Sequence, residues 1–208
     1  MDRKRVGIII FEEVEVLDFC GPFEVFAVAR LNENRRREEA SPFEVLLISQ
    51  SGERVKTTGG MKVIPDVTFD NCPGLDILVV PGGWGTRKEM SNQTMLSFVR
   101  SRASEVHTLA SVCTGALILG KAGLLDGLRA TTHWRSLQTM QELFPNVTVD
   151  LKSHVVKAGK VITSAGISAG IDMALLVVAE YCGETIAHAT ARHMEYPFPQ
   201  SNERRIDL

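Results

Sequence analysis

The sequence predicts a single α/β domain over residues 1–208, in which helices cover both faces of a mostly parallel sheet. Short continuous apolar segments alternate with segments of helical spacing along the chain, and this alternation is typical of parallel βαβ units. The apolar segments also lack the alternating polar residues of a half-exposed strand, as expected of strands buried on both faces. The length of 208 residues fits one large domain.

The first quarter of the chain contains two predicted strands joined by a helix and a charged loop. The apolar run RVGIIIF at 5–11 predicts the first strand, and FEVLLIS at 43–49 predicts the second. Between them, a Gly-Pro pair predicts a helix over 22–30, because proline suits the first helical position. The charged segment 32–42 is short enough to be a surface connection between elements.

The middle of the chain predicts a hairpin and two further strand–helix units. A glycine pair at 59–60 lies between alternating residues and predicts a hairpin over 55–69. The run DILVV at 76–80 predicts a buried strand, and a helix is expected over 86–104. A further apolar run at 106–112 then ends on a cysteine, after which helical spacing resumes.

The last third of the chain predicts three strands and three helices. Strand assignments rest on short apolar runs, and helix assignments rest on helical spacing of apolar residues. The final strand is expected to bend at an Ala-Gly pair. The predicted strands cover 129–132, 147–151 and 155–163, and the predicted helices cover 134–144, 168–181 and 184–195.

Composition and charge exclude several classes of function. The formal net charge of -2 provides no basic surface for nucleic acid. The N-terminus lacks the pattern of a signal peptide, and no apolar run is long enough to span a membrane. The four cysteines are far apart and form no CxxC pair: Cys20, Cys72, Cys113 and Cys182. We therefore expect a cytoplasmic protein with reduced thiols and with neither a metal site nor a bound cofactor.

Cys113 is the strongest candidate for a catalytic residue. It follows a predicted strand and precedes Thr114, Gly115 and a predicted helix, which is the pattern of a strand-to-helix elbow. Such an elbow lifts a side chain above the sheet beside the unpaired N–H groups of the helix. Those groups favour a negative charge, so we expect a lowered thiol pKa and a nucleophilic cysteine. The alternative from this pattern alone is a small hydrophobic core residue.

Three other candidates lie where predicted strands or helices meet. Gly82 and Gly83 follow a strand, so their N–H groups either form an oxyanion hole or belong to a plain turn. Asp18 precedes the predicted helix and is either a capping residue or a partly buried acid. His133 also follows a strand and is either structural or catalytic. All belong to the strand ends at which an open α/β sheet binds ligands.

Six short motifs follow one another along the chain. They are VLD at 16–18 followed by GP at 21–22, VPGG at 80–83, SVCTG at 111–115, GLLDG at 123–127, ATTHW at 130–134 and GISAGID at 166–172. In this order they resemble the ThiJ/PfpI superfamily, which is related to class I glutamine amidotransferases. The resemblance covers about residues 4–197 and is greatest to the isocyanide hydratase branch, and it implies a flavodoxin-like three-layer sandwich. The amidotransferase-like domains of some AraC-type regulators look similar.

The resemblance assigns a role to each candidate. It makes Cys113 the nucleophile and Asp18 its acidic partner, and it makes the N–H groups of Gly83 and Thr114 oxyanion donors together with the Gly82 turn. Thr114 replaces the histidine of the protease-like branch, which argues against peptidase activity. The pocket is expected to be apolar and to be shaped by the side chains or backbone of Phe19, Trp84, His133, Gly166 and Ile167.

Three functions agree with this set of residues. The first is hydration of a small isocyanide to an N-substituted formamide through a Cys113 thioimidate. The second is other cysteine chemistry of the superfamily, either glyoxalase-like or amidase. The third is a non-catalytic redox sensor, in which the thiol is oxidised to sulfinic acid. The resemblance implies a small-molecule substrate and a homodimer, while the net charge and the short apolar runs predict no nucleic-acid or membrane partner.

Overall fold

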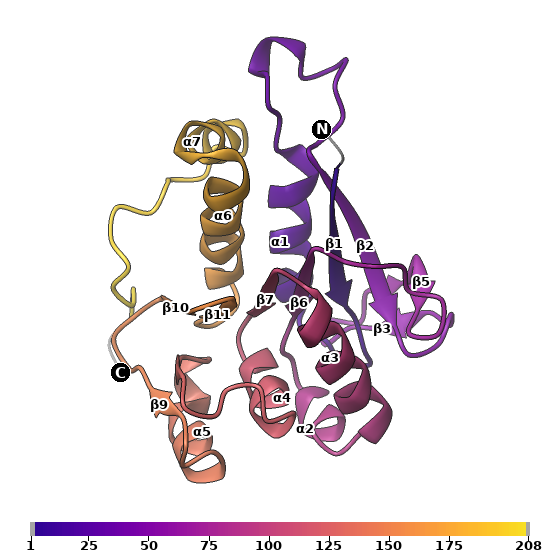
Figure 1. Cartoon of the computed structure of the whole chain (residues 1–208), viewed down its shortest axis with the longest axis vertical. Coiled ribbons are helices and arrows are strands. Elements are labelled where there is room, and N and C mark those ends of the chain that lie inside the picture. The colour runs from indigo at the N-terminus through magenta and orange to yellow at the C-terminus, as the bar shows by residue number, and fades with distance from the viewer. Residues whose placement is uncertain (1–2, 207–208) are drawn as a thin grey trace.

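A computed structural model describes residues 3–206 and shows helices on both faces of a central sheet (Figure 1). The sheet has seven strands in the order β10-β11-β7-β6-β1-β2-β5, and every pair is parallel except β10 and β11. The predicted fold class is therefore confirmed. The strands are β1 (Lys4–Ile9), β2 (Phe43–Ser49), β5 (Val67–Thr68), β6 (Ile77–Val80), β7 (Thr108–Ser111), β10 (Val155–Ala158) and β11 (Val161–Ser164).

The helices form two layers around this sheet. One layer contains α1 (Val16–Val28), α6 (Ala169–Cys182) and α7 (Glu184–His193). The other contains α2 (Thr86–Glu89), α3 (Gln93–Glu105), α4 (Gly115–Lys121) and α5 (Leu137–Leu143). None of the described helices is long and apolar enough to cross a membrane.

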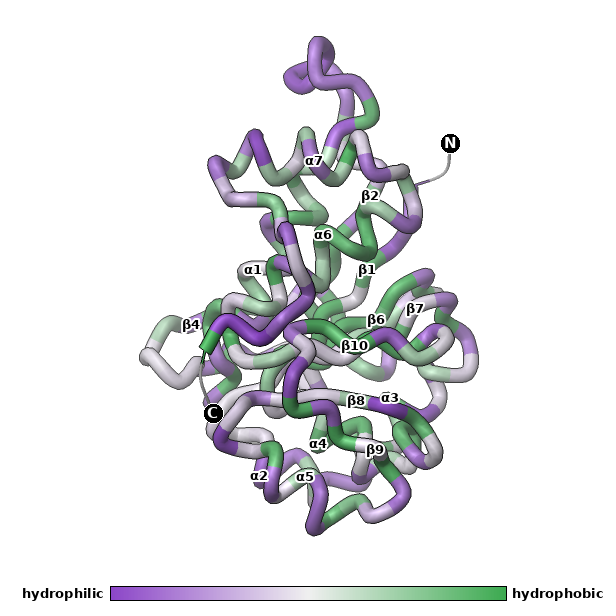
Figure 2. Tube along the Cα trace, turned by 90° about the vertical axis from the view of Figure 1, so that its left-hand side faces the viewer, coloured by the Kyte–Doolittle hydropathy of each residue, from purple (hydrophilic) through white to green (hydrophobic). Residues whose placement is uncertain are grey.

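The apolar strands form the core between the two helix layers. Figure 2 shows hydrophobic residues along β6 and β10, where the chain passes through the middle of the molecule. In β1, the side chains of Val6, Ile8 and Ile9 are completely buried. Ile8 lies between Leu47 of β2 and Val79 of β6 in the parallel register. This burial on both faces explains why the sequence of β1 is a continuous apolar run.

The first helix begins earlier than the sequence predicts. It starts at Val16. Glu15 is the N-cap, and its side-chain carboxylate accepts a hydrogen bond from the N–H of Val16. Pro22 therefore lies inside α1 rather than at its first position. The extra turn is stabilised by tertiary burial of Phe19 and by close packing of Gly21, at which a Cβ would lie 3.0 Å from Ile171 of α6. Packing overrides the local preference of proline here.

Several other boundaries differ from the prediction. The helix expected over 86–104 is broken, because the side chain of Asn92 caps a new helix by accepting the N–H of Thr94 and of Met95. The hairpin expected over 55–69 is shorter than predicted. It consists of two short strands, β3 (Val55–Lys56) and β4 (Lys62–Val63), whereas β5 pairs with β2 in the main sheet. Two further short strands, β8 (Arg129–Ala130) and β9 (Thr148–Val149), form a separate parallel pair. The predicted bend in the last strand is a hairpin turn between β10 and β11.

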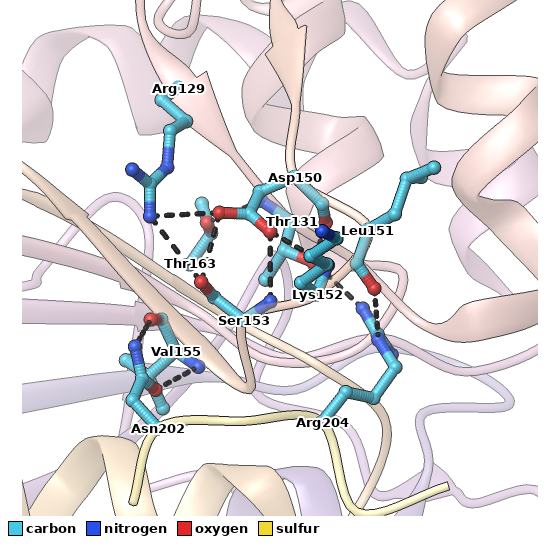
Figure 3. Close-up of polar contacts among 10 residues, drawn as sticks. All are labelled: Arg129, Thr131, Asp150, Leu151, Lys152, Ser153, Val155, Thr163, Asn202 and Arg204. Atoms are coloured by element: carbon cyan, nitrogen blue, oxygen red, sulfur yellow. Dashed lines mark hydrogen bonds and ion pairs between the residues drawn. The ribbon is translucent and has the colours of Figure 1, made fainter. Parts of the chain in front are cut away.

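Residues 196–206, which we call the C-terminal strap, are joined to the rest of the domain by polar contacts of Asn202 and Arg204 (Figure 3). The side chain of Asn202 accepts the N–H of Val155 at 2.8 Å and donates to its carbonyl at 2.7 Å. Arg204 donates to the carbonyl of Leu151, to the hydroxyl of Thr131 and to the carbonyl of Thr132. No local pattern predicts these contacts, because they join residues far apart in the chain.

Loss of the Arg204 contacts is expected to destabilise the strap. Arg204→Gln removes charge-assisted hydrogen bonds to partly buried oxygens, so the free energy of unfolding should fall by about 1–3 kcal/mol. Arg37→Gln is the control, because Arg37 is exposed and makes no polar side-chain contact with a described residue. Urea denaturation of the three proteins measures the difference. Equal midpoints for Arg204→Gln and wild type would contradict this assignment.

Candidate active site

Cys113 lies on a sharp turn between β7 and α4. Its φ of 56° is in the left-handed region, which is unfavourable for a residue with a Cβ and costs about 1–3 kcal/mol. The surrounding structure holds this conformation: the N–H of Cys113 donates to Ala165 at 2.9 Å, and its carbonyl accepts the hydroxyl of Thr132 at 2.7 Å. The elbow predicted from the sequence is therefore present.

The elbow depends on close approach between α4 and the end of β6. A Cβ on Gly115 would lie 2.0 Å from the carbonyl oxygen of Val80, so only glycine fits without a backbone shift. We predict that Gly115→Ala lowers the free energy of unfolding by about 1–3 kcal/mol through overpacking. Gly74→Ala is the matched control, because a Cβ there meets no atom within 4 Å. Thermal unfolding that is equally affected by both substitutions would contradict this prediction.

Asp18 is a buried acid and not the helix cap. It lies in the first turn of α1 and has no exposed surface. Its Oδ2 accepts the N–H of Gly82 at 2.8 Å, while its buried Oδ1 has no hydrogen-bond partner among the described residues. Burial raises the pKa of Asp18 to about 7, and the N–H of Gly82 only partly opposes that rise. The carboxyl group therefore exchanges protons near neutral pH.

The thiol of Cys113 belongs to the same buried cluster as this carboxyl group. Only 6% of Cys113 is exposed. Burial, and then the negative charge of Asp18, raise the pKa of the thiol, while the N–H groups of Thr114 and Ile167 at the sulfur lower it. The expected lowering of the thiol pKa is thus wrong, because loss of solvation and a neighbouring carboxylate outweigh the N–H groups of the elbow. The titrations of acid and thiol are coupled.

Two of the N–H groups predicted as oxyanion donors are engaged elsewhere. That of Gly82 donates to Asp18, and that of Gly83 donates to the hydroxyl of Thr114 at 3.0 Å. The Thr114 hydroxyl also forms a hydrogen bond with the hydroxyl of Thr86 in α2 at 2.9 Å. It therefore connects the elbow after β7 to the segment that follows β6. The N–H of Thr114, which is also a predicted donor, does lie beside the sulfur, together with the N–H of Ile167. Gly82 must be glycine, since a Cβ there would lie 2.4 Å from the Thr114 hydroxyl oxygen.

A cavity of about 500 Å³ contains the thiol. Three of the predicted pocket residues line it, namely Trp84, His133 and Ile167. Phe19 does not: it is 2% exposed and packs in the core, because α1 begins early enough to turn it inward. Gly166 lies behind His133, and a Cβ there would lie 2.2 Å from the imidazole.

The cavity also has a polar rim, which no motif in the sequence predicts. The remaining lining side chains include Glu15, Arg87, Arg135 and Ser136. None of them belongs to a motif or a recognisable spacing, so only tertiary structure brings them together. The expectation of an apolar pocket is therefore wrong for the rim.

His133 occupies the wall of the cavity as a neutral imidazole. Its Nδ1 accepts the N–H of Arg135 at 3.3 Å, which caps the short 3-10 turn η2 (Trp134–Ser136). Burial, followed by the charges of Arg135 and Arg204, lowers its pKa. A catalytic role for His133 stays a prediction.

The functional candidates therefore meet at the carboxyl ends of three neighbouring strands. Asp18 follows β1, Gly82 follows β6 and Cys113 follows β7, and these strands are adjacent in the sheet. A family model described as the DJ-1/PfpI family matches residues 4–180. The chain belongs to the DJ-1/PfpI family.

Relatives within the DJ-1/PfpI family differ in their described activities. Isonitrile hydratase from Pseudomonas putida is 36% identical over 193 residues, covering 92% of this chain and 78% of the relative. The HTH-type transcriptional regulator GbdR from Pseudomonas aeruginosa is 32% identical over 93% of this chain. This chain spans about half of the regulator, 51% of its length.

Solved structures of the DJ-1/PfpI family agree with the fold described above. The crystal structure of a ThiJ/PfpI family protein from Pseudomonas syringae has a TM-score of 0.83 and 30% identity, covering 97% of this chain and 79% of that one. Drosophila melanogaster DJ-1beta has a TM-score of 0.77 over 94% of this chain and 100% of its own. Its identity of 22% supports the shared fold alone.

Proposed function

We propose that this protein hydrates a small isocyanide to an N-substituted formamide. The proposal rests on the buried pair of Asp18 and Cys113: Cys113 lines the cavity, and Asp18, which interacts with the thiol but does not line the cavity, has a pKa of about 7. A group with such a pKa both donates and accepts protons at neutral pH, and the reaction needs both. Similarity to isonitrile hydratase over most of both chains supports the same chemistry.

The first half of the reaction forms a covalent intermediate. The sulfur of Cys113 bonds to the terminal carbon of the isocyanide as its proton passes to Asp18, and Asp18 protonates that carbon. The product is a thioimidate, in which the former isocyanide carbon bears one hydrogen and is double-bonded to nitrogen. The N–H groups of Thr114 and Ile167 beside the sulfur favour the negative charge that develops on it.

Water completes the second half of the reaction. Asp18 removes a proton from water as the water oxygen bonds to the thioimidate carbon, and it passes that proton to the nitrogen. Asp18 then takes the remaining proton of the new hydroxyl group as the carbonyl forms, the carbon–sulfur bond breaks, Asp18 returns that proton to the sulfur, and the formamide is released. The sum is addition of one water to the isocyanide, with the protein unchanged.

The structure gives less support to a redox sensor and to peptidase-like chemistry. A redox sensor needs an exposed thiolate, whereas this thiol is buried and its pKa is raised. Peptidase-like chemistry is implied to use a histidine after the nucleophile, where this chain has Thr114, whose hydroxyl is engaged by Gly83 and Thr86. Glyoxalase-like chemistry uses the same thiol and is distinguished by the substrate.

The test is turnover of a neutral aryl isocyanide by the purified protein. We expect formamide to form with a stoichiometry of one per isocyanide consumed, measured by chromatography against a standard. Parallel incubation with methylglyoxal should leave it unconsumed. Formamide formation no faster than in buffer, or faster loss of methylglyoxal than of isocyanide, would overturn the proposal.

A further inference from the structure

Two arginines without acidic partners lie on the rim of the cavity that contains Cys113. Arg87 belongs to α2 and Arg135 belongs to η2, and both are exposed. Among the described residues, neither guanidinium forms an ion pair or donates a hydrogen bond. The guanidinium of Arg135 lies 4.8 Å from the centre of the Trp134 ring, which orients it by cation–π attraction. Elements distant in sequence therefore bring two cations to one opening.

The charge around this opening is positive. Glu15 is the acid that lines the cavity beside these arginines, and its side chain accepts the N–H of Val16. His133 contributes no charge at neutral pH, because its pKa is lowered. A partly enclosed site with excess positive charge attracts anions more strongly than an open surface does. Trp84 and Ile167 add apolar surface between the rim and the thiol.

We infer that the electrophile accepted by this cavity carries a carboxylate opposite its reactive carbon, and that Arg87 and Arg135 bind that carboxylate. The inference rests on the proposed function for the identity of the reacting group, but not for the charge of its substituent. Guanidinium groups suit carboxylates because their paired N–H groups match the two oxygens. The two arginines are thus specificity-determining residues for the substrate of Cys113.

A pair of alkylating reagents tests this inference without isocyanide turnover. Iodoacetate and iodoacetamide present the same reactive carbon to Cys113 and differ in one negative charge. With either reagent the sulfur–carbon bond forms, the carbon–iodine bond breaks, iodide leaves and the thiol proton passes to solvent. Mass spectrometry of the peptide that contains Cys113 gives the two rate constants, and their ratio is compared with that of a neutral small-molecule thiol, N-acetylcysteinamide.

The comparison among variants decides the outcome. We expect Arg87→Gln/Arg135→Gln to lower the iodoacetate-to-iodoacetamide ratio by about fivefold or more at low salt, and 0.5 M salt to lower the wild-type ratio similarly. Arg87→Lys/Arg135→Lys should retain most of the preference, because it keeps both charges. Lys88→Gln is the matched control, since Lys88 is the exposed neighbour of Arg87 and does not line this cavity. Asp18 is unchanged in every variant, so its charge does not affect the comparison of their iodoacetate-to-iodoacetamide ratios.

A ratio that is unchanged in Arg87→Gln/Arg135→Gln, or lowered equally by Lys88→Gln, would overturn the inference. The same proteins are then compared with 4-isocyanobenzoate and its methyl ester, where wild type should prefer the acid. Formamide formation without any iodoacetate preference refutes the anionic substituent and leaves the hydratase proposal standing. An iodoacetate preference without formamide formation refutes the hydratase and leaves the anion-binding rim standing.

Discussion

Replacement of Cys113 by alanine is expected to reduce formamide production by about 10⁴-fold or more, to the rate in buffer. The substitution removes the atom that bonds to the isocyanide carbon, so no other group in the cavity provides a covalent route. Cys113→Ser should be nearly as inactive, because a hydroxyl is a far weaker acid than a thiol. Initial rates of formamide formation, followed by chromatography, measure the effect.

The control for this experiment is Cys182→Ala, which should keep full activity. Cys182 is the last residue of α6 and does not line the cavity. Cys113→Ala should also remain folded, because alanine and cysteine each have a Cβ and meet the same restriction at a φ of 56°. Persistent turnover in Cys113→Ala, with wild-type stability, would show that another residue performs the chemistry.

Replacement of Asp18 by asparagine should have the second largest effect. Asparagine keeps an acceptor for the N–H of Gly82 but neither donates nor accepts a proton as an acid does. We expect kcat/KM to fall by about 10²–10⁴-fold, as is usual for loss of a general acid–base. The pH profile should also change. In wild type, kcat/KM should change around pH 7 as Asp18 titrates, and this change should be absent from the profile of the variant. An unchanged profile would exclude Asp18 from proton transfer.

The same substitution should stabilise the protein above neutral pH. The folded pKa of Asp18 is about 7, above its ordinary value of 3.8, so the native state binds more protons than the unfolded state between these values. Wild-type stability from this group therefore falls as pH rises through that window. At pH 8, Asp18→Asn should be more stable than wild type by at most about 4 kcal/mol. The difference should shrink toward pH 4.

Asp150→Asn is the control with the opposite sign. Burial alone would raise the pKa of Asp150, but the N–H groups of Ser153 and Lys152, the Ser153 hydroxyl and the charge of Arg129 together lower it below its ordinary value. Its contribution to stability is thus present at neutral pH and lost as pH falls through its lowered folded pKa. Urea denaturation across pH 4–8 compares both variants with wild type. Parallel curves for Asp18→Asn and Asp150→Asn would contradict the assigned environments.

Local signals in the sequence were sufficient for the parts of the fold that depend on local chemistry. The continuous apolar run of β1 and the strand–cysteine–glycine pattern around Cys113 each specify their own geometry. The start of α1 was missed because burial of Phe19 and Gly21 outweighs the preference of Pro22 for a first helical position. Tertiary packing decides such boundaries, and no local pattern reports it.

The candidate site was likewise predictable only where its chemistry lies in short motifs. The motifs predict Cys113, Asp18 and Thr114 as residues of the site, but they do not predict how deeply these side chains are buried or which groups contact them. The contact between Gly82 and Asp18 joins residues 64 positions apart. Burial of Cys113 and the neighbouring Asp18 carboxylate raise the thiol pKa, which the elbow pattern predicts to be lowered. The anion-binding arginines Arg87 and Arg135 carry no motif at all. The homodimer that the resemblance implies stays a prediction.

Trapping of the covalent intermediate on Cys113 is the decisive test of the hydratase mechanism. The protein is mixed with a neutral aryl isocyanide, quenched within one turnover, digested and analysed by mass spectrometry. We expect the peptide containing Cys113 to gain the mass of one whole isocyanide and to lose that mass as formamide accumulates, and we expect Asp18→Asn to alter the rate at which the adduct appears. Formamide formation with an unmodified Cys113 peptide throughout, or an adduct on another residue, would contradict it.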